Sequence, residues 1–314
     1  MSGHDHNHGV SAESFSEGTA YALMMGIALN LVIVVVEIVA GYIAGSLGLL
    51  SDAVHNFTDM AALGLSWFAF EQARKPATAA KTFGYHRTGI LTALINATVL
   101  VVITVWIFYE AYHRLLDPQP VGGLLVLVTA TVALLANLLI VFFLRKRAGG
   151  DINIRSAVLH LLGDAAASAA VVISGIVIIA TGWYPVDPLV SVLLGLAILW
   201  GAWRIIKETV EIFLEESPRA IDVDRVVEEL MEEDGVKDIH DIHVWTIGSG
   251  IYALSCHVLV DDVKVSDSSR IARYLKKMLA RDFDIHHSTL EMETVPCDVN
   301  GPYCDIQHQH NRPD

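Results

Sequence analysis

Two histidine–aspartate pairs with the same spacing stand out in the sequence: His55 with Asp59, and His160 with Asp164. In each pair the aspartate follows the histidine by four residues, which places both side chains on one face of a helix. Two such helices packed face to face would bring together two imidazole nitrogens and two carboxylates. Four ligands of these types suit a tetrahedral Zn²⁺ ion. A hydrogen-bond network between helices is the alternative, but the repeated spacing favours a metal site.

The segments that carry these pairs are apolar, which makes the ionisable groups expensive. A charged side chain well inside a membrane span costs roughly 2.5–3.5 kcal/mol on insertion scales. Two carboxylates and two imidazoles at matching depths are therefore hard to retain without a partner. A bound dication supplies that partner, and protons can partly neutralise the acids when the metal is absent.

The elements that must position the pairs are long hydrophobic blocks. The chain has 314 residues, of which 53% are hydrophobic, and six blocks reach the roughly 20 apolar residues that a membrane-spanning helix needs. The predicted spans are 20–44, 47–73, 88–114, 121–145, 153–181 and 186–213. The first block lacks a basic flank and a small-residue cleavage site, so we interpret it as a retained span and not a signal peptide.

The loops between the predicted spans differ in charge. Lysines and arginines gather in the second and fourth connections, and the other three connections have only Arg114 near a membrane end. Basic loops favour the cytoplasmic side, so both termini are expected in the cytoplasm, and the compact chain suggests a prokaryotic plasma membrane. The net charge of -14 argues against a nucleic-acid partner, and the acidic run after residue 207 is typical of a solvated surface.

After Pro218 the pattern becomes that of a small soluble domain. The periodicity predicts helices at 222–234 and 266–281 and strands at 239–247, 251–260 and 285–295. This αββαβ order predicts a ferredoxin-like α/β domain. The expected division is a His-bearing tail (1–18), a six-helix membrane domain (19–214), this cytoplasmic domain (215–296) and a Cys/His-containing tail (297–314). A three-stranded sheet leaves an edge or face to cover, which favours a homodimer.

The six spans, the two HxxxD pairs and the terminal α/β domain together resemble the cation diffusion facilitator family over nearly the whole chain. Two further stretches match, Ser51 to His55 and Phe83-Gly84-Tyr85-His86-Arg87. The resemblance implies a homodimeric exporter of divalent metal that exchanges metal for protons, with the two pairs as transport-site ligands. It also implies that His55 favours Zn²⁺ over other metals, with Co²⁺ or Cd²⁺ as alternative substrates.

The C-terminal domain contains histidines that the resemblance connects with a regulatory zinc ion. By position His240, His257 and His287 match best, and Glu291 is a weaker candidate. Exposed strand histidines without a metal are the alternative. Cys297 and Cys304 with His308 and His310 are a further candidate cluster, and His4, His6 and His8 could capture metal weakly.

Other polar residues lie inside the predicted spans. Asp52 precedes His55 by one turn and could act directly or support the ligands. Glu37 and Glu110 could line a water-filled path or bond between helices, and the structural role is favoured for the asparagines Asn30, Asn96 and Asn137.

Two other functions use the same site: a metal uptake carrier and a membrane metal sensor. A symmetric coordination sphere has no direction, so the residues do not decide between export and import. An enzyme is not indicated, because the sequence has no GxxxxGK[ST] motif and the Gly248-Ser249-Gly250 turn lacks the context of a nucleophile elbow. No organic cofactor is expected.

Overall fold

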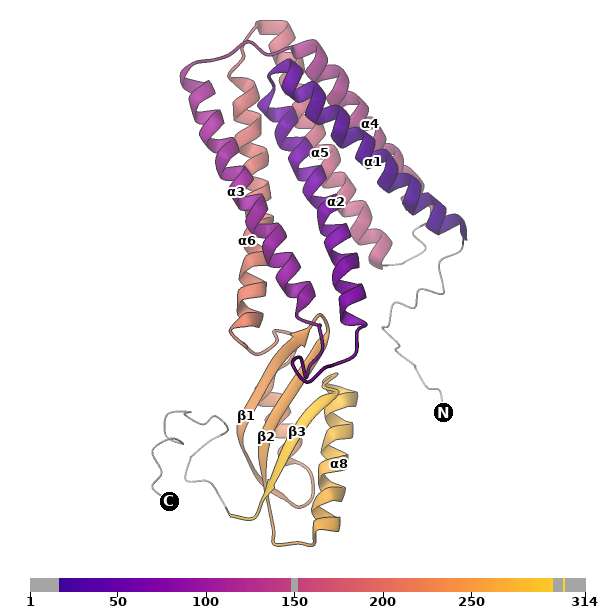
Figure 1. The fold of residues 1–314 in the computed structure, drawn as a ribbon, viewed down its shortest axis with the longest axis vertical. Coiled ribbons are helices and arrows are strands. Elements are labelled where there is room, and N and C mark those ends of the chain that lie inside the picture. The colour runs from indigo at the N-terminus through magenta and orange to yellow at the C-terminus, as the bar shows by residue number, and fades with distance from the viewer. Residues whose placement is uncertain (1–16, 148–151, 296–301, 303–314) are drawn as a thin grey trace. The chain divides into compact units, whose positions relative to one another are not determined.

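The computed structural model describes residues 17–147, 152–295 and 302. Its first part consists of long helices and its last part of a small α/β unit, as Figure 1 shows. The six long helices are α1 (Glu17–Ala44), α2 (Leu47–Ala73), α3 (Thr88–Leu116), α4 (Gly123–Arg147), α5 (Ile152–Thr181) and α6 (Val186–Phe213).

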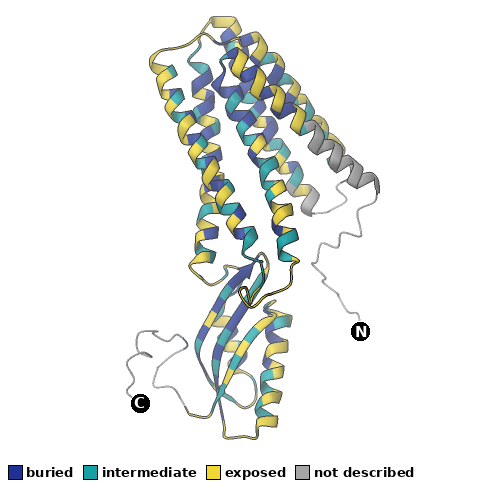
Figure 2. Cartoon of the chain, in the orientation of Figure 1, coloured by how far each residue is buried: buried dark blue, intermediate teal, exposed yellow. Residues whose placement is uncertain are grey.

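Four of the described helices are long and apolar enough to cross a membrane: α3, α4, α5 and α6. The helix α2 has the length, but its central Ser51, Asp52, His55, Asn56 and Asp59 lower its mean hydropathy. Large apolar side chains of these helices are exposed, among them Leu63, Val102 and Trp200. Figure 2 shows exposed residues along the long helices. Exposed apolar side chains on every long helix are what a lipid environment requires.

Contacts divide the chain into two compact units, residues 1–63 with 98–202 and residues 64–97 with 203–314. In the first unit the core lies between α1, α2, α4, α5 and α6. The helices α4 and α5 approach closely because glycines face the neighbouring backbone. A Cβ atom on Gly175 would lie 3.0 Å from the backbone nitrogen of Leu127. Small residues at such contacts are typical of helices packed in membranes.

The second unit contains the C-terminal α/β fold: α7 (Val223–Met231), β1 (Val236–Gly248), β2 (Ile251–Val260), α8 (Val265–Asp282) and β3 (His287–Glu293). The strand order is β1-β2-β3, with β2 antiparallel to β1 and parallel to β3. The predicted αββαβ order is confirmed. The core includes Val226 and Leu230 of α7, Leu275 and Leu279 of α8, and Leu254 of β2.

A β-bulge in β1 decides which side chains face this core. His240 pairs with His257 and His243 pairs with Ser255, so Asp241 and Ile242 together oppose the single residue Cys256. Asp241 has a φ of 51°, the left-handed conformation that such a bulge uses. Because of the extra residue, Ile239 and Ile242 both join the core. His240 is left on the other face of the sheet.

Candidate metal centres

The first candidate centre lies between α2 and α5, where the two His/Asp pairs meet. His55 Nε2 lies 3.5 Å from Asp164 Oδ1, and His160 Nε2 lies 3.2 Å from Asp59 Oδ2. Within each pair the nitrogen and oxygen are 3.8 Å apart. The two imidazole rings are 6.4 Å apart, centroid to centroid. One ligand atom from each of His55, Asp59 and Asp164 lies within 4.8 Å of the other two, and His160 approaches both aspartates without joining that group.

These distances match the needs of a small tetrahedral ion. An ion bonded at roughly 2.0–2.1 Å holds neighbouring ligand atoms about 3.4 Å apart. The contacts of 3.2–3.8 Å bracket that separation. Asp59 Oδ2 and Asp164 Oδ1 are also buried without a hydrogen-bond donor. Buried carboxylate oxygens without a donor are expected where a cation binds.

Burial differs among the four groups. Asp164 is buried, His55 and Asp59 are partly buried, and the side chain of His160 is 54% exposed. His160 is thus the most exposed of the four groups. An ion between the two pairs would have the buried Asp164 on one side and the more exposed His160 on the other.

Three further polar contacts surround this centre. Asn56 Nδ2 donates to Glu37 Oε2 at 3.2 Å, which joins α1 to α2. Ser168 Oγ donates to Asp52 Oδ2 at 2.9 Å, which joins α5 to α2. The structure therefore gives Asp52 and Glu37 contacts with polar neighbours and not with the four ligands. Glu110 differs, because it forms an ion pair at 2.8 Å with Arg114 of its own helix.

The start of α2 is fixed by a carboxylate from α6. Asp187 accepts hydrogen bonds from Ser46 Oγ (2.5 Å), Leu47 N (2.6 Å) and Gly48 N (3.3 Å). These donors include backbone groups that the first turn of a helix leaves unpaired. In the preceding turn, Gly45 has a φ of 65° and its carbonyl accepts from Arg114. The helix that carries His55 and Asp59 is thereby anchored at its N-terminal end.

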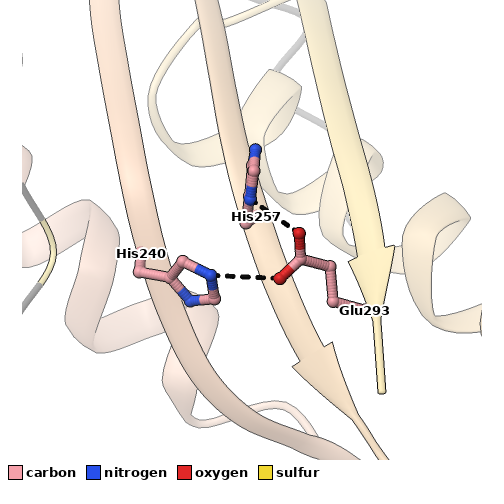
Figure 3. Close-up of side chains that lie close together, drawn as sticks. All are labelled: His240, His257 and Glu293. Atoms are coloured by element: carbon pink, nitrogen blue, oxygen red, sulfur yellow. Dashed lines mark hydrogen bonds and ion pairs between the residues drawn. The ribbon is translucent and has the colours of Figure 1, made fainter. Parts of the chain in front are cut away.

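The second candidate centre lies on the sheet of the C-terminal unit (Figure 3). His240 Nε2 is 3.1 Å from Glu293 Oε2, and His257 Nδ1 is 2.8 Å from Glu293 Oε1. One ligand atom from each residue lies within 4.8 Å of the other two. The bulge places His240 on this face, and the pairing of β1 with β2 sets it opposite His257. His240 is buried, whereas the other two residues are partly buried.

The prediction that His287 joins this cluster is not supported, because the register of β3 places it elsewhere. His287 pairs with Ala253 at the start of β3, whereas Glu291 pairs with His257. The ring of His287 contacts Phe83, with centroids 5.4 Å apart. Glu293, two residues after Glu291 and on the same face of β3, takes the place that sequence reasoning gave to His287. Glu291 itself approaches His257 Nε2 at 3.6 Å.

The remaining sequence candidates lie outside the described residues: His4, His6 and His8, and the Cys297, Cys304, His308 and His310 group. Cys256 is described and buried, in the core face of β2. Burial raises the pKa of its thiol to about 12. A thiol in that state is neither a metal ligand nor a nucleophile at neutral pH.

A helical membrane domain with converging metal-ligand groups, followed by a small α/β domain, defines a membrane transport protein for metal cations. Comparison with protein families agrees. A family model described as the cation efflux transmembrane domain matches residues 23–214. A second model, described as the cytoplasmic domain of cation efflux proteins, matches residues 218–295. The chain belongs to the cation efflux family, and it is a transporter and not an enzyme. The resemblance to cation diffusion facilitators is confirmed.

Curated relatives match along nearly the whole chain. The zinc transporter ZitB of Escherichia coli is 35% identical over 315 residues, covering 98% of this chain and 99% of the relative. The metal cation efflux system protein CzcD of Cupriavidus metallidurans is 35% identical, covering 94% and 91%. The cadmium, cobalt and zinc/H(+)-K(+) antiporter of Bacillus subtilis is also 35% identical, covering 93% and 92%.

Among solved structures, the metal-bound C-terminal domain of the CzcD transporter is 36% identical to this chain. It covers 23% of this chain and 99% of that domain, with a TM-score of 0.22.

Proposed function

We propose that the protein exports Zn²⁺ from the cytoplasm in exchange for protons, with His55, Asp59, His160 and Asp164 as the ligands of the transported ion. The observation that supports this most strongly is the approach of each histidine to the aspartate of the other helix, at 3.5 Å for His55 and Asp164 and at 3.2 Å for His160 and Asp59. The names of the relatives add support, since they include a zinc transporter and an antiporter of cadmium, cobalt and zinc. Co²⁺ and Cd²⁺ are the expected alternative substrates.

Proton exchange follows from the chemistry of the ligands. Metal binding requires neutral imidazole and ionised carboxylate, so protons and metal compete for the same atoms. Zn²⁺ arriving from the cytoplasm displaces protons from the site to that side. After the helices rearrange, protons from the other side displace the metal. The half-exposed His160 is the first ligand that an entering ion or proton meets.

Flux into proteoliposomes tests the proposal. Purified protein should accumulate zinc faster when the lumen is more acidic than the outside, with protons leaving as zinc enters. Asp59→Ala and Asp164→Ala should lose zinc flux while eluting as folded protein. The matched control is Asp117→Ala, an exposed carboxylate in the loop after α3. Zinc flux that moves no protons and ignores the pH gradient would exclude the exchange mechanism.

We further propose that the C-terminal domain binds a regulatory zinc ion through His240, His257 and Glu293. The three ligand atoms lie within 4.8 Å of one another. They comprise two imidazoles and a carboxylate, a common zinc set. Zinc titration of the full-length protein monitored by calorimetry should show a binding event that His257→Ala removes.

The expected assembly is a homodimer formed through this domain, in a bacterial plasma membrane with both termini in the cytoplasm. Support comes from the match to the cytoplasmic domain of cation efflux proteins and from basic residues in the loop before α3, at the end of α4 and at the start of α5. Light scattering of the purified protein should give twice the mass of the 34.2 kDa chain. Labelling of cysteines introduced at either end of the chain in intact cells should fail with a membrane-impermeant reagent.

A further inference from the structure

Two buried carboxylates next to the transport site have no role in holding the metal. Glu37 of α1 is 0% exposed and Asp52 of α2 is 1% exposed. Each has one oxygen that accepts a hydrogen bond, from Asn56 and Ser168 respectively. The other oxygen of each, Glu37 Oε1 and Asp52 Oδ1, is buried without a hydrogen-bond partner. Burying such an oxygen costs free energy unless a cation binds it or a donor forms a hydrogen bond to it.

The charges around these carboxylates do not balance. No lysine or arginine occurs in residues 30–44, 47–73 or 157–181, the described parts of the helices that carry the two acids and the four ligands. Four carboxylates, Glu37, Asp52, Asp59 and Asp164, share this interior with two histidines. A divalent ion offsets the two ligand aspartates. Glu37 and Asp52 remain without a cation at bilayer depth, where an uncompensated charge is expensive.

The pair is also connected to the metal site. Asn56, the donor to Glu37, directly follows His55 in α2, and Ser168, the donor to Asp52, follows Asp164 by one turn of α5. The neighbouring helix α4, which packs against α1, has no ionisable side chain between Gly123 and Leu144. Both acids are therefore held by donors that lie beside the proposed ligands His55 and Asp164, and the charge of Asp164 is neutralised each time the metal binds.

We propose that Glu37 and Asp52 form a counter-cation site that empties when the transport site takes up metal. A monovalent cation on the pair and a dication on Asp164 repel each other across the same interior. Binding of one must weaken binding of the other, and this coupling is reciprocal. The inference rests on the proposed exchange function and extends it, because some of the cations that are exchanged for the metal would bind to residues other than the four metal ligands.

The chemistry of the site favours a proton as the cation. A proton forms an O–H bond to one carboxylate oxygen, and the structure offers one unpartnered oxygen on each acid. A potassium ion would need several oxygens around it, and both acids already use one oxygen to accept a hydrogen bond. When zinc binds Asp164, the O–H bond breaks and the proton leaves to water, while the carboxylate keeps the electron pair.

Calorimetry of zinc binding to full-length protein tests this inference. The heat is measured in buffers of different ionisation enthalpy, which gives the number of protons released per zinc ion bound. All proteins carry His240→Ala, His257→Ala, Cys297→Ser and Cys304→Ser, which remove the candidate metal clusters of the C-terminal domain and the C-terminal tail. In Glu37→Gln and Asp52→Asn the number should fall by up to about one, and the dependence of zinc affinity on pH should flatten correspondingly.

The control variant is Glu110→Gln, the same substitution in another long helix where Arg114 already neutralises the carboxylate. It should release as many protons as the parent protein. Glu37→Asp keeps the carboxylate and should release almost as many protons as the parent protein. If Glu37 had only a structural role, the number of protons released would instead fall in proportion to the loss of thermal stability in every variant. If Glu37→Gln does not fold, Asp52→Asn gives the same measurement.

A second arm replaces potassium with choline in the buffer. Zinc affinity that rises on potassium removal in the parent protein, but not in Asp52→Asn, would identify potassium as the cation and support the counter-cation site. Proton release equal to the parent in both acid variants, with no potassium effect, overturns the inference and leaves zinc–proton exchange intact. A parent protein that releases neither cation when zinc binds overturns both.

Discussion

His160 Nε2 of α5 lies 3.2 Å from Asp59 Oδ2 of α2, so the closest contact in the candidate transport site joins the two HxxxD pairs. The pairs therefore cross over, with each histidine nearer to the aspartate of the other helix than to its own. A bound ion in this arrangement connects α2 to α5. Any movement that separates the two helices must break the coordination, which ties release of the metal to helix motion.

His55→Asp should change which metal is transported. The variant replaces an imidazole nitrogen with a carboxylate oxygen, and oxygen-rich sets suit Mn²⁺ better than Zn²⁺. The ratio of zinc flux to manganese flux should fall by about tenfold or more. The measurement is competitive flux into proteoliposomes. His113→Asp, at the far end of α3, is the control and should keep the native ratio; an unchanged ratio in His55→Asp would remove His55 from the ligand set.

Asp187→Ala should destabilise the membrane domain without removing the metal site. The change leaves the Leu47 and Gly48 N–H groups at the start of α2 without their acceptor. Loss of buried, charge-assisted hydrogen bonds should lower the free energy of unfolding by roughly 1.5–3 kcal/mol. Denaturant titration in detergent measures this, with Asp117→Ala as the exposed control. Equal stability of the two variants would contradict the anchoring role.

Glu293→Gln should weaken metal binding in the C-terminal domain, because it replaces a carboxylate that meets both His240 and His257. His287→Ala is the matched control and should bind normally, since β3 places His287 opposite Ala253. Elemental analysis of the full-length protein at limiting free zinc measures the zinc bound per chain. This number should fall in Glu293→Gln and stay unchanged in His287→Ala. The opposite pattern, with loss in His287→Ala alone, would show that the register of β3 is different.

Cys256 should resist alkylation in the folded protein. Because burial raises the pKa of its thiol to about 12, only roughly one molecule in ten thousand carries the thiolate at pH 8. With Cys297→Ser and Cys304→Ser in place, iodoacetamide should label the protein only after denaturation. Mass spectrometry measures the label. Rapid labelling of folded protein would contradict the burial of β2 in the core.

The approach of the two His/Asp pairs could be predicted from sequence because the information was local. A spacing of four residues fixes one helical face, and two identical pairs in apolar segments leave few ways to satisfy four ionisable groups. The αββαβ order was predictable for the same reason, since it needs only periodicity within each segment.

Relationships between distant segments were not predictable. Nothing near Asp187 indicates that it caps α2 from the start of α6. The position of His287 opposite Ala253 was not predictable, because alternation gives the face of a strand and not its register. In β3 a shift of four positions keeps the face but changes the neighbour of His257. The bulge at Asp241 has a weak signal, because aspartate tolerates the left-handed conformation, but many aspartates in strands do not adopt it.

The central claim is that side chains from α2 and α5 share a single metal ion. X-ray absorption at the zinc edge tests it directly, on full-length protein that carries His240→Ala, His257→Ala, Cys297→Ser and Cys304→Ser and is loaded with about one zinc ion per chain. The account predicts four nitrogen and oxygen ligands at roughly 2.0–2.1 Å, with two imidazoles that fall to one in His55→Ala and in His160→Ala. A shell containing sulfur, or an imidazole count unchanged by either substitution, would contradict it.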